Sequence, residues 1–235
     1  MTVDSVREAV NSERLLRTAK ELISVPSPTG EAGAAADRLS ELLSADGFVV
    51  ERMAAGHPKA PAVITRLNGH KPGLTLQFDG HMDTVHLPYH PPEVRGGFLQ
   101  GSGSADMKAG LAAAIEALRA VRDAGGLPAG EILLTAHDLH EAPWGYGEQL
   151  NEMIAAGVFG DAVMLPEYEA SELPVAGRGS AVISVTVSRA GEPMHEVLGG
   201  AEQPDVIAAG AELTLALSLI HICRCRRYSL CRSRW

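Results

Sequence analysis

The sequence predicts an α/β protein in which a mixed sheet carries helices on both faces. Segments whose apolar residues recur at helical spacing alternate along the chain with short, mostly apolar runs typical of strands. Hydrophobic residues make up 46% of the 235 residues and charged residues 21%, which is enough for a sizeable core. The chain contains no run of eighteen apolar residues, so we expect no membrane span.

Each predicted element rests on a local pattern. Apolar residues at helical spacing predict a helix over Ser5–Val25, which the prolines and glycine of Pro26–Gly30 end. A second helix follows over Glu31–Ala45. Strands are expected at Phe48–Arg52, Ala62–Leu67, Leu74–Phe78, Ile132–Ala136 and, as a short buried strand, Ala162–Leu165; further helices are expected at Met107–Ala124 and Gly147–Ala156.

The pattern changes after Ser180. The run AVISVTVSRA alternates strictly between apolar and polar residues, which predicts a half-exposed strand that opens a second domain. Val206–Leu217 (VIAAGAELTLAL) is alanine-rich and is interpreted as an amphipathic helix. We therefore place a first domain at 1–176 and the start of a second at 177–216.

The formal charge of −9 argues against nucleic acid as a partner. The first residues, MTVDSVREAVNSERLL, lack the basic and then apolar order of a secretory signal, so a cytoplasmic location is expected. All three cysteines and five of the 20 basic residues lie in the last 13 residues, so the cysteines do not indicate a redox compartment.

The tail from Leu217 reads LSLIHICRCRRYSLCRSRW and differs abruptly from the chain before it. A basic arm and a small metal-binding tail are two interpretations, but Cys-x-Cys with a distant third cysteine lacks the paired spacing of a zinc site. LSLIHI resembles a translated sequencing-adapter end. We therefore expect 217–235 to be non-native and the native chain to be interrupted near 216.

Ionisable residues cluster where the predicted strands end. His81 and Asp83 follow the strand that ends at Phe78, and an imidazole with a nearby carboxylate suits a metal site. A surface turn built on Asp and Gly is the alternative. Asp106 lies in Gly101–Gly110 (GSGSADMKAG), where it would alternatively cap the following helix. Two more groups follow later strands: His137–Gly145 (HDLHEAPWG) and Glu167 after Pro166.

Together these elements resemble a known family, the co-catalytic dinuclear zinc hydrolases that include acetylornithine deacetylase, succinyl-diaminopimelate desuccinylase, aminoacylase and glutamate carboxypeptidase. The resemblance covers about Ser5–Leu215, and the pair GHMDTV (80–85) and GSGSADMKAG (101–110) carries it most specifically. VPSPTGE (25–31) and GRG (177–179) agree with it. It implies a zinc-peptidase-like sheet in a catalytic domain, followed by the start of an inserted α+β lid domain that forms a dimer.

The resemblance also implies roles for matched residues. His81, Asp106 and Glu167 would bind one zinc ion, Asp106 would bridge to a second ion, and Glu141 would bind that second ion. Asp83 would orient His81. Two Zn²⁺ per subunit are implied, and Co²⁺ or Mn²⁺ would also suit such ligands.

One position departs from the family pattern. Members carry a Glu-Glu doublet whose first residue is the general base, whereas this chain has His140-Glu141. A histidine can accept a proton from water, so His140 takes the base position by register. Asp138 or Glu141 as base, and His140 as a loop-stabilising residue, remain alternatives. Trp144 is either a pocket wall or a core residue.

His195 in GEPMHE matches the family's lid histidine, which reaches the partner subunit's active site, and a surface histidine is the alternative. The family's last metal ligand is a histidine in a segment that returns from the lid, and no residue here matches it. We therefore expect a full-length hydrolase of N-acyl amino acids or C-terminal peptide bonds, acting as a homodimer, and an inactive 235-residue chain. A metal-binding pseudoenzyme and an acidic scaffold are the competing hypotheses.

Overall fold

The computed structural model describes residues 2–167 and the backbone of 180–186, 194–198, 204–207 and 212–218. The chain divides into two compact units, Met1–Glu169 and Ala170–Trp235. The expected domain boundary at 176 lies outside the described residues. None of the described helices is long and apolar enough to cross a membrane.

The first unit is built on a five-stranded mixed sheet with the strand order β1-β2-β6-β3-β7. β2 runs antiparallel to both of its neighbours, β1 and β6, while β6, β3 and β7 run parallel to one another. The strands are β1 (Val50–Met53), β2 (Ala62–Asn68), β3 (Thr75–His81), β6 (Glu131–His137) and β7 (Ala162–Met164).

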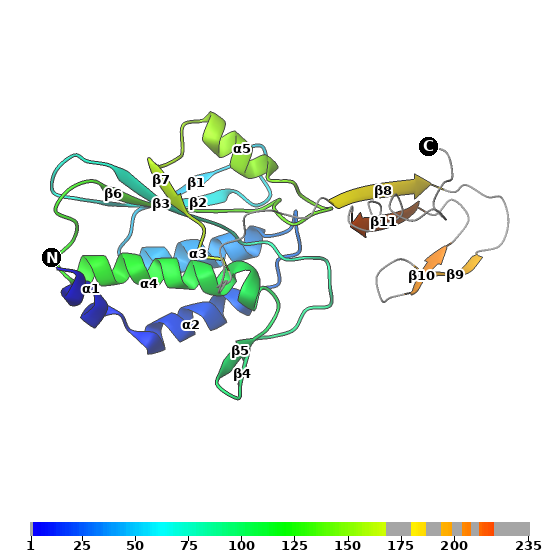
Figure 1. Ribbon diagram of the computed structural model, residues 1–235, viewed down its shortest axis with the longest axis horizontal. Coiled ribbons are helices and arrows are strands. Elements are labelled where there is room, and N and C mark those ends of the chain that lie inside the picture. Colours follow the sequence, from blue (N-terminus) through cyan, green and yellow to red (C-terminus); the bar gives the residue numbers. More distant parts are fainter. Residues whose placement is uncertain (1, 168–179, 187–193, 199–203, 208–211, 219–235) are drawn as a thin grey trace, which may run out of the picture. The chain divides into compact units, whose positions relative to one another are not determined.

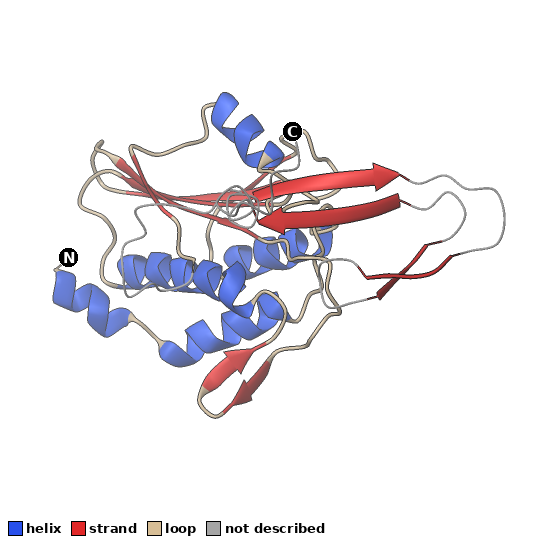
Figure 2. Ribbon diagram, turned by 45° about the vertical axis from the view of Figure 1, so that its right-hand side comes forward, coloured by secondary structure: helices blue, strands red, loops and turns tan. Residues whose placement is uncertain are grey.

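Helices cover both faces of this sheet, as predicted (Figure 1). On one face lie α2 (Ser12–Ile23), α3 (Gly33–Ala45) and α4 (Ala109–Asp123), with the short α1 (Val3–Ala9) beside α4. On the other face lies α5 (Glu148–Ala155), and Figure 2 shows the same division from a second direction. A large apolar cluster joins the three-helix face to Val63 and Leu134 of the sheet, and a smaller one joins Met153 of α5 to Ile64 and Leu133.

Two predictions for the first unit are wrong in detail. The single helix over Ser5–Val25 is two helices, because Asn11 caps α2 by accepting from the Arg14 amide while its own amide donates to Glu116 of α4. The buried strand after Ala162 is instead exposed. β7 lies at the edge of the described sheet, and Val163 and Met164 are 54% and 52% exposed.

In the second unit, the strand expected from Ser180 is confirmed as β8 (Ser180–Thr186). The helix expected over Val206–Leu217 is wrong, because β10 (Pro204–Ile207) and β11 (Glu212–Ser218) are strands. β11 pairs antiparallel with β8, and β10 with β9 (Met194–Leu198). Leu213, Leu215 and Leu217 recur at every second position, the period of a strand, and here this pattern outweighs the helix propensity of the alanines.

Candidate metal centre

The two parallel strands β3 and β6 end at the same place, with His81 opposite His137 in the register. Their carboxyl ends therefore start two connecting segments side by side, one with Asp83 and the other with His140 and Glu141. Sites in α/β sheets form at such strand ends because the segments that leave them converge there.

His81 is the buried centre of this edge, with 1% of the residue exposed. Its Nε2 lies 2.8 Å from Asp106 Oδ1, and its Nδ1 lies 3.0 Å from the backbone oxygen of Asp83 and 3.5 Å from Asp83 Oδ1. Burial alone lowers the pKa of His81, but the hydrogen bonds and charges of Asp83 and Asp106 outweigh it and raise this pKa to about 9. An imidazole held by two carboxylates at this site is therefore protonated at neutral pH.

Asp106 reaches His81 from a kinked segment, η1 (Ser104–Lys108), where its φ of −128° and ψ of 97° are extended rather than helical. The residue that caps α4 is Lys108, so the alternative that Asp106 is a helix cap is wrong. The side chain of Asp106 is half exposed. Asp106 therefore presents a carboxylate to both His81 and solvent.

Glu141 completes a group with possible metal ligands, because one ligand atom each of His81, Asp106 and Glu141 lie within 4.8 Å of one another. Burial and then the charge of Asp106 raise the pKa of the Glu141 carboxyl. The backbone of the Glu141 segment is held by Asp83, whose Oδ2 accepts from the amides of His140 and Glu141 at 3.1 Å each. Asp83 thus contacts both strand ends, and its buried Oδ1 has no hydrogen-bond partner in the described part of the chain.

His140 stacks its ring on that of His81, with the centroids 4.2 Å apart and the planes 11° from parallel. Burial of the ring and the positive charges of His81 and His137 lower the pKa of His140. A neutral imidazole beside the carboxylate group is able to accept a proton. The stack also fixes the ring against its neighbour, in keeping with the loop-stabilising alternative.

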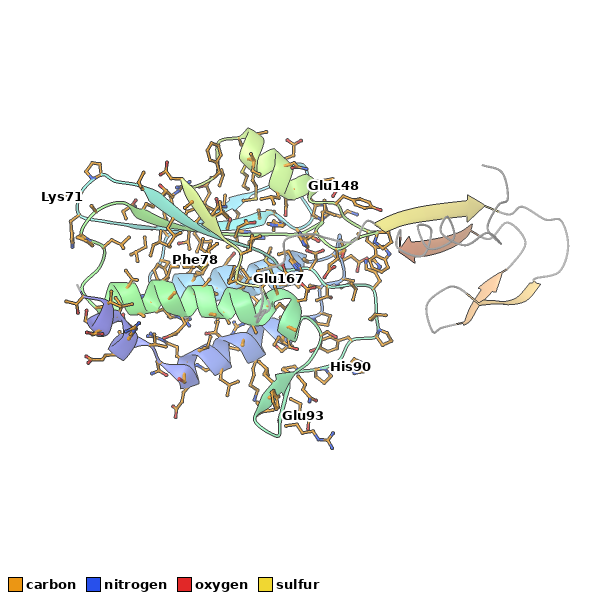
Figure 3. All side chains as sticks on the ribbon, viewed as in Figure 1. Lys71, Phe78, His90, Glu93, Glu148 and Glu167 are labelled. Atoms are coloured by element: carbon orange, nitrogen blue, oxygen red, sulfur yellow. The ribbon has the colours of Figure 1, made fainter. Side chains whose placement is uncertain are left out.

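Glu167 approaches from the end of β7, and Figure 3 labels it beside the N-terminal end of α4. Its close approach depends on Gly110, because a Cβ at that position would lie 1.5 Å from the Pro166 carbonyl oxygen. The charge of Glu167 contributes to the raised pKa of Glu141. Glu167 is not in the group of ligand atoms within 4.8 Å, so it borders that group rather than joining it.

Sequence reasoning missed the function of Asp138 as an anchor. This carboxylate is fully buried and accepts from the backbone amides of Gly30, Ala32 and Leu139 at 2.6 to 3.0 Å. It therefore joins the segment before α3 to the end of β6. A buried carboxylate with three amide donors is not accessible to water, so the alternative that Asp138 is the base is wrong.

The burial of Lys108 was also missed, although a lysine at the start of an apolar helix can indicate a buried charged side chain. The residue is 2% exposed, and its Nζ donates to the Val25 carbonyl at 2.7 Å. Burial lowers its pKa to about 8, against the attraction of the Asp83 charge. Lys108 thus adds a buried cationic group near the Asp83 carboxylate.

The remaining sequence-based site residue is His195, which lies in β9. Its side chain is outside the described residues, as is the GRG segment at 177–179. The structure therefore brings together His81, Asp83, Asp106, His140 and Glu141, places Glu167 at their border, and leaves His195 as a prediction.

Comparisons with known proteins agree with this architecture. Residues 78–202 match the family described as peptidase family M20/M25/M40. A succinyl-diaminopimelate desuccinylase of Sphingopyxis alaskensis is 33% identical over 164 residues, which are 65% of this chain and 42% of that protein. This chain thus spans less than half the length of that curated relative.

Two solved structures share the fold. A tripeptidase from Staphylococcus aureus has a TM-score of 0.58 and 26% identity, over 77% of this chain and 52% of that one. A di-peptidase from Saccharomyces cerevisiae has a TM-score of 0.66 and 18% identity, over 83% of this chain and 48% of that one. The mixed sheet with helices on both faces is therefore an established arrangement.

Proposed function

The chain belongs to peptidase family M20/M25/M40, and from this membership we propose that the complete protein is a metal-dependent hydrolase of amide bonds. The substrate class would be an N-acyl amino acid or the C-terminal bond of a short peptide. The observation that carries the proposal is the convergence of His81, Asp106 and Glu141 at the carboxyl ends of β3 and β6.

The donor set fits a metal ion. One imidazole and two carboxylates are ligands that zinc accepts, and two further carboxylates, Asp83 and Glu167, adjoin them. We propose two Zn²⁺ sites that share Asp106, with His81 and Glu167 in one and Glu141 in the other. When bound, the metal would lower the pKa of a water molecule and polarise the scissile carbonyl.

The chain's own residues would do the positioning and the proton transfer. The Asp83 backbone oxygen accepts from Nδ1–H of His81, which leaves Nε2 as the ligand atom. The Asp83 carboxylate fixes the backbone of His140 and Glu141. A neutral His140 would accept the proton of the attacking water at its ring nitrogen and deliver it to the leaving amine.

Because this chain spans less than half the length of its curated relative, the partners and full activity remain proposals for the whole protein. We propose a homodimer in which His195 contacts substrate. The resemblance places a further histidine ligand outside the matched residues, so we expect metal binding but little turnover from these 235 residues alone.

A second candidate is a metal-binding protein without turnover. The stacking of His140 on His81 favours it, because a ring held in this way would not reach a substrate. His140→Ala in the complete protein separates the two candidates: it should abolish hydrolysis if His140 is the base, whereas the second candidate has no hydrolysis to lose.

The test is a zinc titration by calorimetry, combined with hydrolysis of a panel of N-acetyl amino acids, N-succinyl amino acids and dipeptides. We expect stoichiometric zinc binding that His81→Ala and Asp106→Ala abolish, and zinc-dependent hydrolysis once the complete protein is used. Zinc binding without hydrolysis by the complete protein would favour the second candidate. Equal behaviour of both variants and the wild type would refute the metal centre.

A further inference from the structure

Two aromatic side chains form a stacked pair at the rim of the metal centre. The rings of His86 and Trp144 lie with their centroids 4.3 Å apart and their planes 1° from parallel. His86 follows Asp83 by three residues and Trp144 follows Glu141 by three residues. The pair therefore joins the two segments that leave β3 and β6, outside the group of ligand atoms.

The backbone around the pair is held in place. The amide of Trp144 donates to the Glu141 carbonyl at 3.0 Å, so Trp144 is one turn from a proposed ligand. His86 Nε2 lies 3.0 Å from the Thr29 carbonyl oxygen, which makes that nitrogen the donor. Gly145 allows no side chain, because a Cβ there would lie 2.2 Å from the Leu139 backbone. Because three segments hold the His86–Trp144 pair, the pair keeps a fixed position relative to the proposed metal ligands.

Trp144 nevertheless remains 43% exposed, which is unusual for the largest apolar side chain when it is already stacked on one partner. Leu87 and Tyr146, close to the pair in sequence, are 67% and 63% exposed. The two segments Val85–Pro92 and Ala142–Gly147 contain no Lys, Arg, Asp or Glu. These two segments of the rim therefore offer apolar and aromatic surface and no carboxylate, lysine or arginine to pair with a charged substrate side chain.

We propose that the His86–Trp144 pair is a specificity-determining wall that binds an aromatic or bulky apolar group of the substrate. This inference rests on the proposed function. It narrows the substrate class to N-acyl amino acids or peptides that carry an aromatic or bulky apolar group next to the scissile amide. Aromatic groups stack well on an indole face, whereas a carboxylate would lose hydration there without gaining a partner.

The test is calorimetric binding of N-acetyl-L-phenylalanine and N-acetyl-L-alanine to the zinc-loaded chain. Both compounds carry the same charge, so the ratio of their dissociation constants isolates the benzyl group. We expect the phenylalanine compound to bind about tenfold more tightly to the wild type, as one aromatic contact allows. Trp144→Ala should bring the ratio close to one, and Trp144→Phe should retain most of it.

Phe98→Ala is the matched control, because Phe98 is an exposed aromatic residue on the separate β4–β5 hairpin (Glu93–Arg95 and Phe98–Gln100) and should leave the ratio unchanged. His86→Ala provides a second variant if Trp144→Ala unfolds, and it should also reduce the ratio. A wild-type ratio of one, an unchanged ratio in Trp144→Ala or His86→Ala, or tighter binding of N-acetyl-L-aspartate would overturn the wall. Zinc stoichiometry measured in the same samples tests the proposed function separately, since a wild-type chain that binds zinc but shows no aromatic preference refutes only the wall.

Discussion

The metal centre has two halves that differ in burial. His81, Asp83 and Asp138 leave the ends of β3 and β6 and are at most 1% exposed. Asp106, by contrast, comes from a kinked connecting segment and has a half-exposed side chain, and Glu141 and Glu167 are only partly buried. The first group is the buried half of the site and the second is the open half.

The halves also differ in what holds them. Backbone amides fix the carboxylates of the buried half, which are therefore in place before any ion arrives. Burial and, next, the negative charge of Asp106 raise the pKa of the Glu141 carboxyl, so these two carboxylates of the open half repel each other. A divalent cation would remove that repulsion. The buried half thus acts as scaffold, and the open half depends on the ion for its stability.

The largest effect is expected from removing the buried imidazole of His81, which contacts Asp106 of the open half. His81→Ala should weaken zinc binding by at least about 100-fold, because it removes an imidazole ligand outright. Calorimetric titration measures the loss. His70→Ala, which changes an exposed histidine in the connection before β3, at the opposite end of that strand from His81, should bind zinc like the wild type. Equal affinity in both variants would place the ion elsewhere.

The next largest effect concerns the attachment of the open half to α4. Helix propensity alone predicts that Gly110→Ala stabilises the chain by up to about 1 kcal/mol. The contact with Pro166 predicts the opposite sign, a loss of about 1 to 3 kcal/mol, because backbone must move to admit the Cβ. Thermal unfolding decides the sign. Ala113→Gly, at an exposed position of the same helix, measures the propensity term by itself, and a stabilised Gly110→Ala would contradict the close approach.

The metal ligands and the sheet were predicted in different ways. His81, Asp106 and Glu141 were expected as ligands because the motifs that contain them resemble those of a known family, and the structure places them together. The sheet with helices on both faces was predicted because its elements have distinct periods, 3.6 for helices and 2 for strands. Local patterns therefore predicted the fold, and the resemblance of the motifs predicted the ligands.

The predictions that were wrong or missing depend on distant contacts. Asp138 anchors Gly30 across 108 residues, and no local pattern reveals such a bond. The break before α2 depends in part on Glu116, which lies 105 residues from Asn11. The exposure of β7 also depends on distant parts of the chain, because an apolar run predicts a strand but not which other elements cover it.

A smaller effect is expected from pH on the metal-free chain. The pKa of His81 is raised from its ordinary value of 6.5 to about 9, so its protonation favours the folded state. This stabilisation is fully present below about pH 6.5 and is lost as the pH rises through 9. We expect a loss of about 1 to 3 kcal/mol, allowing for the solvent around the half-exposed Asp106. Denaturant unfolding of metal-free wild type and His81→Ala between pH 6 and 9.5 measures this loss as the difference between the two profiles, because the lowered pKa of Lys108 raises stability over the same pH range in both. A difference that does not change with pH would contradict it.

The smallest effect would come from the open half itself, where Glu141→Gln removes one of the repelling carboxylates. The pKa of Glu141 is raised above the ordinary value of 4.5, so its ionised carboxylate destabilises the folded state at neutral pH. This destabilisation disappears below pH 4.5, where the carboxyl is protonated in both the folded and the unfolded states. The metal-free variant should therefore be more stable than the wild type by less than about 1 kcal/mol at pH 7, since solvent screens this partly exposed carboxylate. The two should be equally stable at pH 4, and the variant should bind zinc more weakly. Glu152→Gln, an exposed residue of α5, should change neither quantity. Destabilisation of metal-free Glu141→Gln at pH 7 would mean that Glu141 belongs to the buried half. Its carboxylate would then stabilise the folded chain without a metal ion, which contradicts its place in the open half.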